Sequence, residues 1–101
     1  MAIYRTITSS PATTVLITKG GIQTGIIKEI SIANFSDNAA DAIVNLYLND
    51  GGATDIYLFK NVAIPKGATL LLDNNIAFDK DRFSLKMYST GTAPALAIII
   101  K

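Results

Sequence analysis

The residue types that most often carry out catalysis are missing from this chain. It contains no histidine and no cysteine, so it has no imidazole base, no Ser-His or Cys-His nucleophile and no zinc or copper site of the usual ligands. Most enzyme mechanisms are thereby excluded. We expect a protein that is not an enzyme and uses no cofactor.

The densest group of carboxylates falls between residues 73 and 82. Two of them could hydrolyse a glycosidic bond, but Lys80 and Arg82 would lower the pKa of an acid that must have a raised pKa. The same oxygens could bind Ca²⁺, with the candidates Asp73, Asn74, Asn75, Asp79 and Asp81. Their spacing lacks the calcium loop and its distal Glu, so two polar turns without a metal are the simpler interpretation.

Glycines and tyrosines give two weaker hints of a ligand. The glycine pairs at 20–21 and 51–52 match no phosphate-binding fingerprint, because no predicted helix follows them. Four tyrosines could stack on a sugar: Tyr4, Tyr47, Tyr57 and Tyr88. They fall on four different predicted strands, where packing between neighbouring strands is the more frequent explanation. A carbohydrate- or ligand-binding module stays open as the second interpretation.

The elements that would position these residues are strands. Apolar side chains recur at every second residue, and clusters of Gly, Asn, Asp and Pro separate the stretches. We predict about eight strands, over residues 3–8, 13–18, 25–35, 42–49, 54–60, 68–73, 83–89 and 95–101. The pattern predicts a single domain over residues 1–101, an all-β antiparallel sandwich of the jelly-roll or immunoglobulin-like type.

A hairpin over residues 42–60 is the sharpest local prediction, because Asn49-Asp50-Gly51-Gly52 joins two alternating stretches. On its second arm, Ile56 and Leu58 would face the core while Tyr57 and Phe59 would face outward. Such an outward pair would form an adhesive surface, unless a loop or the sandwich edge of the same subunit covers it.

Two other strands have unusual patterns. Lys28-Glu29 interrupts the alternation of residues 25–35, which predicts a bulge or kink there. Residues 95–101 are apolar on both faces, so this strand must pair centrally in a sheet or be covered by a partner. The inward positions of all strands give the expected core: Ile30, Ile32, Val44, Leu46, Leu48, Ile56, Leu58, Leu70, Leu72, Phe83, Leu85, Met87, Leu96, Ile98 and Ile100.

The charge content of the chain is low. Hydrophobic residues make up 50% and charged residues 17%, and the net charge is +1. Because no basic patch is present, we expect neither nucleic acid nor an anionic membrane as a partner. No apolar stretch approaches the ~20 residues of a spanning helix, and no signal peptide is visible. A surface with so few charges suits packing against other subunits, which predicts a homo-oligomer.

From Gly25 onward the sequence resembles small virion structural proteins of tailed bacteriophages. The resemblance rests on Ala33-Asn34, on Val62-Ala63-Ile64-Pro65-Lys66-Gly67-Ala68-Thr69-Leu70, and on Leu71-Leu72-Asp73. It continues through Ile76-Ala77-Phe78-Asp79, the stretch 83–88, and Gly91-Thr92-Ala93 before the last apolar strand. It implies a β-sandwich in a phage particle, synthesised in the host cytoplasm, and carries over no catalytic residue.

The expected function is therefore that of a capsid decoration or cement protein, with a neck or tail component as an alternative. Its partners would be capsid or other virion proteins and copies of itself, and the resemblance suggests a trimer. Attachment would use shape-complementary β surfaces repeated over a symmetric lattice. The expected contact residues are Tyr4, Asn49, Asp50, Tyr57 and Phe59.

Overall fold

The computed structural model describes residues 3–8, 12–21, 26–37, 41–73, 75–91 and 95–101, and these residues form strands and turns without a helix. Ten strands occur in them: β1 Ile3–Ile7, β2 Ala12–Ile17, β3 Ile26–Ile27, β4 Ile30–Asn34, β5 Ala42–Asn49, β6 Asp55–Ile64, β7 Thr69–Leu72, β8 Ile76–Ala77, β9 Ser84–Gly91 and β10 Leu96–Ile100. The all-β prediction is confirmed. The two strands beyond the expected eight are the short β3 and β8.

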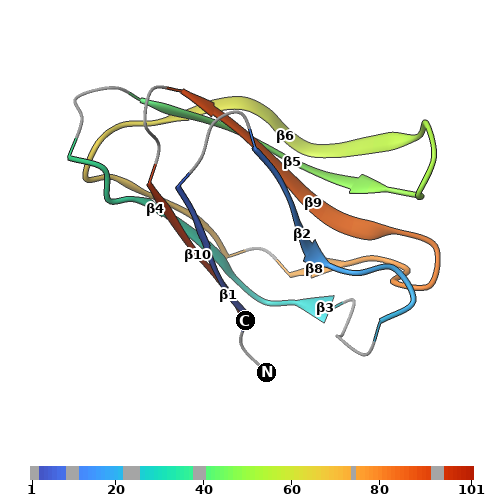
Figure 1. Ribbon diagram of the computed structural model, residues 1–101. Helices are drawn as coiled ribbons and strands as arrows, with labels where there is room; N and C mark the ends of the chain where they lie inside the picture. The colour runs from blue at the N-terminus through green and yellow to red at the C-terminus, as the bar shows by residue number, and fades with distance from the viewer. Residues whose placement is uncertain (1–2, 9–11, 22–25, 38–40, 74, 92–94) are drawn as a thin grey trace.

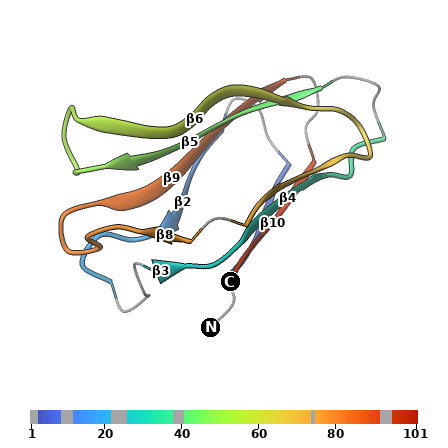
Figure 2. The same ribbon diagram turned by 180° about the vertical axis from the view of Figure 1, so that it is seen from behind.

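Two four-stranded antiparallel sheets are stacked on each other, as Figures 1 and 2 show from opposite sides. We call the sheet with the order β1-β10-β4-β7 sheet A, and the sheet with the order β2-β9-β5-β6 sheet B. The short β3 and β8 pair at one end of the molecule. Aliphatic side chains from the inner faces of both sheets fill the space between them, as in other sandwiches.

The pairing of the strands identifies the sandwich as a jelly roll. β1 pairs with β10, β2 with β9, β3 with β8, β4 with β7, and β5 with β6. The chain therefore resembles one long hairpin, with its bend between β5 and β6, wrapped so that neighbouring pairs fall in different sheets. An immunoglobulin-like sandwich would keep its first two strands in one sheet, whereas here β1 lies in sheet A and β2 in sheet B.

The predicted irregularity at Lys28-Glu29 is confirmed as a break between β3 and β4. The backbone N–H groups of Lys28 and Glu29 both donate to the carbonyl of Lys101, at 2.8 and 3.3 Å. Two residues opposite one are the signature of a bulge. The prediction that the last strand pairs centrally is also confirmed, because β10 lies between β1 and β4.

Most of the predicted core is buried, and four of the five exceptions lie on the edge strands β6 and β7. Ten of the expected side chains are buried: Ile30, Ile32, Val44, Leu46, Leu48, Leu85, Met87, Leu96, Ile98 and Ile100. Leu70, Leu72 and Phe83 are half-buried against them. Ile56 and Leu58 were expected inside but are 46% and 36% exposed. The core also includes residues that the pattern did not indicate: Ile7, Leu16, Ile17, Ile27, Ala42 and Ile64.

The error on β6 beyond Tyr57 comes from two shifts in its register with β5. Leu48 pairs with Ile56 and Tyr47 with Tyr57, but Leu46 pairs with Phe59, so Leu58 is an extra residue. A second shift follows at Asn61, whose φ of 56° is positive. Each extra residue reverses the faces of the side chains beyond it. The expectation that Phe59 faces outward with Tyr57 is therefore wrong, because Phe59 packs against the core.

Asn34 connects the two sheets at the crossover from β6 to β7. Its buried side-chain amide donates to the Ile64 carbonyl at 2.9 Å and accepts from the Ser36 N–H at 3.1 Å. The Asn34 backbone also bonds to Ala68 and Gly67, at 2.9 and 2.8 Å. The two parts of the sequence pattern, residues 33–34 and 62–70, are thus neighbours in space. The pattern marks the residues whose hydrogen bonds fix the crossover from β6 to β7.

Candidate docking surfaces

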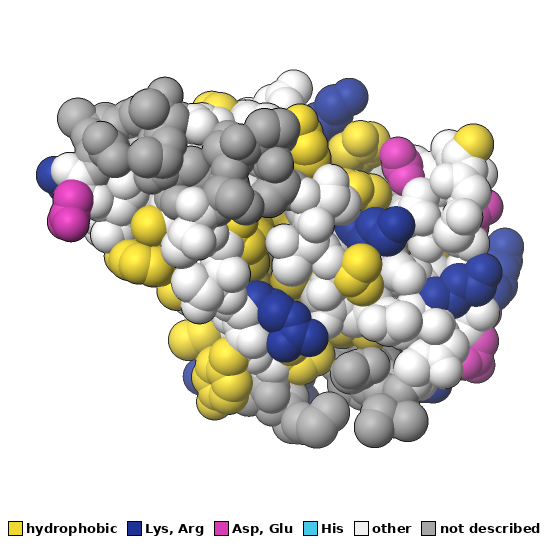
Figure 3. All heavy atoms as spheres, viewed as in Figure 1, with side chains coloured by type: hydrophobic (Ala, Val, Ile, Leu, Met, Phe, Trp, Pro, Cys, Tyr) yellow, Lys and Arg dark blue, Asp and Glu magenta, His cyan; other side chains and the backbone are white. Residues whose placement is uncertain are grey.

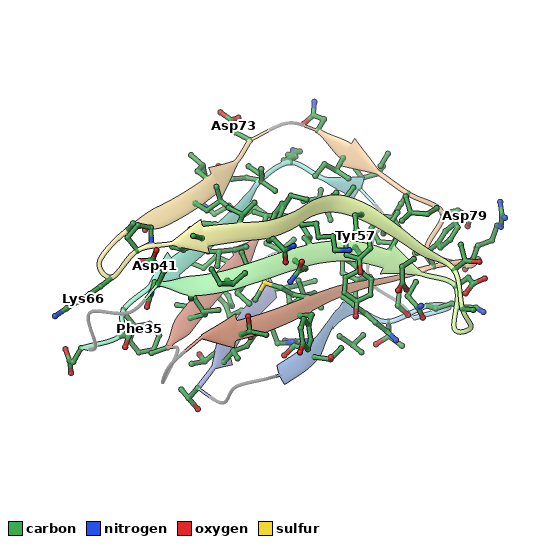
Figure 4. All side chains as sticks on the ribbon, turned by 90° about the horizontal axis from the view of Figure 1, so that it is seen from above. Phe35, Asp41, Tyr57, Lys66, Asp73 and Asp79 are labelled. Carbon is green, nitrogen blue, oxygen red and sulfur yellow. The ribbon has the colours of Figure 1, made fainter. Side chains whose placement is uncertain are left out.

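The carboxylates that were considered for calcium do not form one cluster. Figure 4 shows Asp73 and Asp79 well apart, and Asn74 lies outside the described residues. The Asp79 carboxylate accepts from the Asp81 N–H at 3.1 Å, and the Asp79 carbonyl accepts from Arg82 and Phe83. These bonds close a turn. Within the described ranges, no group of three or more metal-binding side chains is gathered.

The two sheets expose very different outer faces. We call the outer face of sheet A the uncharged face, because its eight central side chains carry no charge: Tyr4, Thr6, Ser31, Ala33, Thr69, Leu71, Ala97 and Ile99. They form two rows across the four strands. One row runs Tyr4–Ile99–Ser31–Leu71, and the next runs Thr6–Ala97–Ala33–Thr69. Tyr4 is 67% exposed and Leu71 is 52% exposed.

The outer face of sheet B is built from tyrosines, amides and lysines, and we call it the tyrosine face. Tyr47 on β5 and Tyr57 on β6 are opposite each other, with ring centroids 5.3 Å apart. The Lys60 ammonium lies 4.9 Å from the centre of the Tyr57 ring. Tyr88 and Lys86, on β9, pair with Asn45 and Tyr47 of β5. The explanation of the tyrosines as cross-strand packing is confirmed for this pair.

Buried amides hold the tyrosine face in place. The Asn45 side chain donates to the Tyr88 carbonyl at 3.2 Å and accepts from the Asn61 N–H at 2.9 Å. The second contact satisfies the backbone at the bulge of β6. Burial raises the pKa of Tyr47, and the nearby Asp55 and Tyr57 raise it further, against a hydrogen bond to the Thr13 side chain that lowers it.

Asn49 and Asp50 organise the β5–β6 turn instead of standing free. The buried Asn49 amide donates to the carbonyls of Gly52 and Thr54, and to the Asp55 carboxylate at 2.6 Å. The Asn49 side-chain oxygen accepts from the Gly51 N–H at 2.9 Å. The Asp50 carboxylate accepts from the Gly52 N–H at 2.8 Å, and this bond holds the pKa of Asp50 below its usual value.

The free edge of sheet B exposes a continuous apolar stretch. Ile56, Tyr57 and Leu58 are 46%, 44% and 36% exposed, and no strand of the described residues pairs with the other side of β6. In Figures 1 and 2 this part of the hairpin extends past sheet A, toward the end of the molecule where β3 and β8 pair. We call these three residues the β6 edge. Sequence reasoning missed it because it placed Ile56 and Leu58 in the core.

The five expected contact residues are therefore scattered. Tyr4 lies on the uncharged face and Tyr57 on the β6 edge, both exposed. Asn49 and Asp50 belong to the turn, and Phe59 points inward. Figure 3 shows charged side chains at both ends of this view and also between them. No described helix is long and apolar enough to cross a bilayer.

Comparison with known proteins gives a weak likeness. No protein-family model matches the sequence, and no curated protein matches it. A chain from the structure of infectious bursal disease virus, Gt strain, aligns with a TM-score of 0.43 and 13% identity, over 99% of this chain and 30% of that chain. For the Gx strain the TM-score is 0.42 and the identity 11%, over 98% and 29%. This protein thus spans less than a third of those chains, and a likeness of this size carries no argument about function.

Proposed function

We propose that this protein is a non-enzymatic structural component of a tailed-phage particle, a decoration or cement protein that attaches to the shell through the β6 edge. The resemblance of residues 25–101 to phage virion proteins supports this function. The jelly-roll fold is compatible with it, since viral capsid domains are among the proteins that use this fold. The observation that carries the proposal is the exposed apolar edge strand.

The β6 edge has the properties of a contact surface. An unpaired strand that exposes large apolar side chains invites association, and natural proteins usually cover or charge such edges. Its three side chains are roughly 40% exposed, so covering each one would contribute about 1 kcal/mol. One copy would therefore bind weakly. Repetition over a symmetric shell would raise the effective concentration and make the attachment stable.

Bulges decide how this edge makes contact. The register shifts at Leu58 and Asn61 interrupt the row of free N–H and C=O groups along β6. A partner strand could not continue the ladder past such shifts. The edge is thus suited to side-chain packing against a preformed surface, with Lys60 and Asp55 beside it to fix the orientation of the partner.

A sugar-binding module is the alternative that the tyrosines suggested. A sugar stacks on the open face of an aromatic ring, but Lys60 lies over the Tyr57 ring and Tyr47 packs tilted against it. These neighbours favour contact with protein over stacking with sugar at this position. A protein at the neck or on the tail would use the same β6 edge. Electron microscopy of particles that have bound the protein distinguishes these locations from the shell.

The test is binding to particles from which the gene for this protein has been deleted. The double variant Ile56→Thr/Leu58→Thr places β-branched side chains at both positions, which suits a strand, but removes much of the apolar surface. We expect it to co-sediment with the particles at least tenfold more weakly than the wild type. The matched control is Val15→Thr, which changes an apolar side chain that is 41% exposed on β2, at the opposite edge of sheet B.

Equal binding by the double variant and the wild type would remove the β6 edge from the proposal. Purified particles that lack the protein, or that keep their thermal stability and infectivity after its gene is deleted, would contradict the structural role. Electron microscopy of the rebound particles would place the protein on the shell, at the neck or on the tail.

A further inference from the structure

The uncharged face has a pattern that its own copy can match. The row Tyr4–Ile99–Ser31–Leu71 contains three large side chains, whereas the neighbouring row Thr6–Ala97–Ala33–Thr69 contains small ones. The rows are two residues apart along the strands, which is about 6.8 Å. The face is thus a ridge, interrupted at Ser31, beside a shallow strip, and both rows cross all four strands of sheet A.

We infer that the uncharged face is a self-association surface, where a second copy packs about a two-fold axis. The axis lies between the two rows and parallel to them. This rotation places the large row of each copy over the small row of the other. Tyr4 then covers the partner's Thr6, and Leu71 covers the partner's Thr69. Interlocking of this kind is what packing of two sheets ~10 Å apart requires.

The absence of charge on these eight positions favours a second copy as the occupant. In a two-fold contact each residue meets residues of the same surface, and a surface without charged side chains leaves no charge that must find a partner when it is buried. The outer face of sheet B is less suited to such a contact, because a second copy would desolvate the ammonium groups of Lys60 and Lys86. On sheet A, the exposed charges Asp73 and Lys101 follow the ends of β7 and β10. They would form a polar rim around an uncharged centre, as interfaces commonly have.

The size of the face sets the strength of the contact. Four strands at ~4.8 Å spacing and four residues at ~3.3 Å rise give on the order of 250 Å² of sheet. Stable pairs bury roughly 800 Å² on each partner. The dimer should therefore be weak and should depend on concentration, with a dissociation constant well above the micromolar range. This surface is separate from the β6 edge, so the inference holds whether or not the protein attaches to a particle.

A charge exchange at Thr69 tests the inference on the whole chain. Thr69 is exposed on the edge strand β7, so neither Thr69→Glu nor Thr69→Lys should disturb folding, which circular dichroism and thermal unfolding would verify. The two-fold axis brings Thr69 of one copy near Thr69 of the other. In sedimentation equilibrium up to millimolar concentration, we expect the wild type to form dimers and each variant to associate at least tenfold more weakly.

An equal mixture of the two variants should recover association to within about threefold of the wild type, because opposite charges then meet across the axis. Recovery in the mixture is a result that damage to the fold or binding by a different protein would not produce. A wild type that stays monomeric at millimolar concentration, a trimer, or a mixture without recovery would overturn the inference. The variant Ile56→Thr/Leu58→Thr should dimerise like the wild type, so failure of this inference and failure of particle binding are distinguishable.

Discussion

The outer faces of the two sheets differ, although their inner faces are alike. Inside, both sheets present aliphatic residues such as Leu46 of sheet B and Leu96 of sheet A, each fully buried. Outside, sheet A shows hydroxyls, small side chains and a few large apolar groups, while sheet B shows tyrosines, lysines and hydrogen-bonded amides. The inner faces build the sandwich, so the outer faces are free to specialise.

The difference follows from how each outer face satisfies its polar groups. Sheet B buries Asn45 and Asn49, and each of these amides both donates to and accepts from backbone groups. The outer face of sheet A buries no amide and relies on its strand ladder. A face held by specific polar contacts tolerates little rearrangement, whereas a face of rows of plain side chains can accept a second layer.

Truncation of the core should have the largest effect, and a similar one in both sheets. Leu46→Ala and Leu96→Ala each remove a side chain with 0% exposure, which should lower the free energy of unfolding by about 2 to 5 kcal/mol. Urea denaturation would measure both losses. If only one of the two variants lost less than about half a kcal/mol, the two inner faces would not contribute equally to the free energy of unfolding.

Removal of one polar side chain from each outer face should lower the free energy of unfolding by different amounts. Asn49→Ala leaves the donors and acceptors of the hairpin turn without their partner, which should cost about 1 to 3 kcal/mol. Ser31→Ala is the matched change on the uncharged face, where no described residue shares a side-chain hydrogen bond with it, and should cost less than about 0.5 kcal/mol. Equal losses in thermal unfolding would contradict the contrast between the faces.

The smallest effect concerns the alkaline stability of the tyrosine face. The pKa of Tyr47 is raised above 10.0, first by burial, so the folded state holds this proton more tightly than the unfolded chain does. Its contribution is fully present below pH 10 and is lost as the pH rises through the folded-state pKa. Tyr47→Phe removes this titration together with the hydrogen bond to Thr13.

At neutral pH the Tyr47→Phe variant should be less stable than the wild type by about 1 kcal/mol, because the hydrogen bond is gone. The difference should stay constant from pH 6 to 9 and become smaller above pH 10. Urea denaturation at a series of pH values would measure it. A difference that widens above pH 10 would mean that the folded state does not favour the protonated tyrosine.

Local features of the fold were predictable because adjacent residues carry them. The alternation of Val44, Leu46 and Leu48 gave the inner face of β5, and the turn at 49–52 gave the hairpin. The loss of alternation at Lys28-Glu29 indicated the bulge. The side chains of β6 beyond Tyr57 were assigned to the wrong faces, since β6 contains extra residues at Leu58 and Asn61 that no local pattern marks.

The candidate surfaces were less predictable than the fold. Tyr57 was expected to be exposed and is, but Ile56 and Leu58 are exposed as well, because they lie on β6, the edge strand of sheet B. The uncharged face combines β1, β4, β7 and β10. Its rows form only when these strands pair in register, so the sequence of any one strand does not predict the surface.

The sequence determined the fold class of this protein, the absence of imidazole and thiol chemistry, and most of the core. Residue type and the recurrence of apolar side chains at every second residue are local properties. The tertiary structure decided between a jelly roll and an immunoglobulin-like sandwich, since β1 pairs with β10 across nearly the whole chain. It also decided which residues face solvent together. Pairing of this kind depends on contacts between distant segments, and on the burial that only the assembled sheets provide.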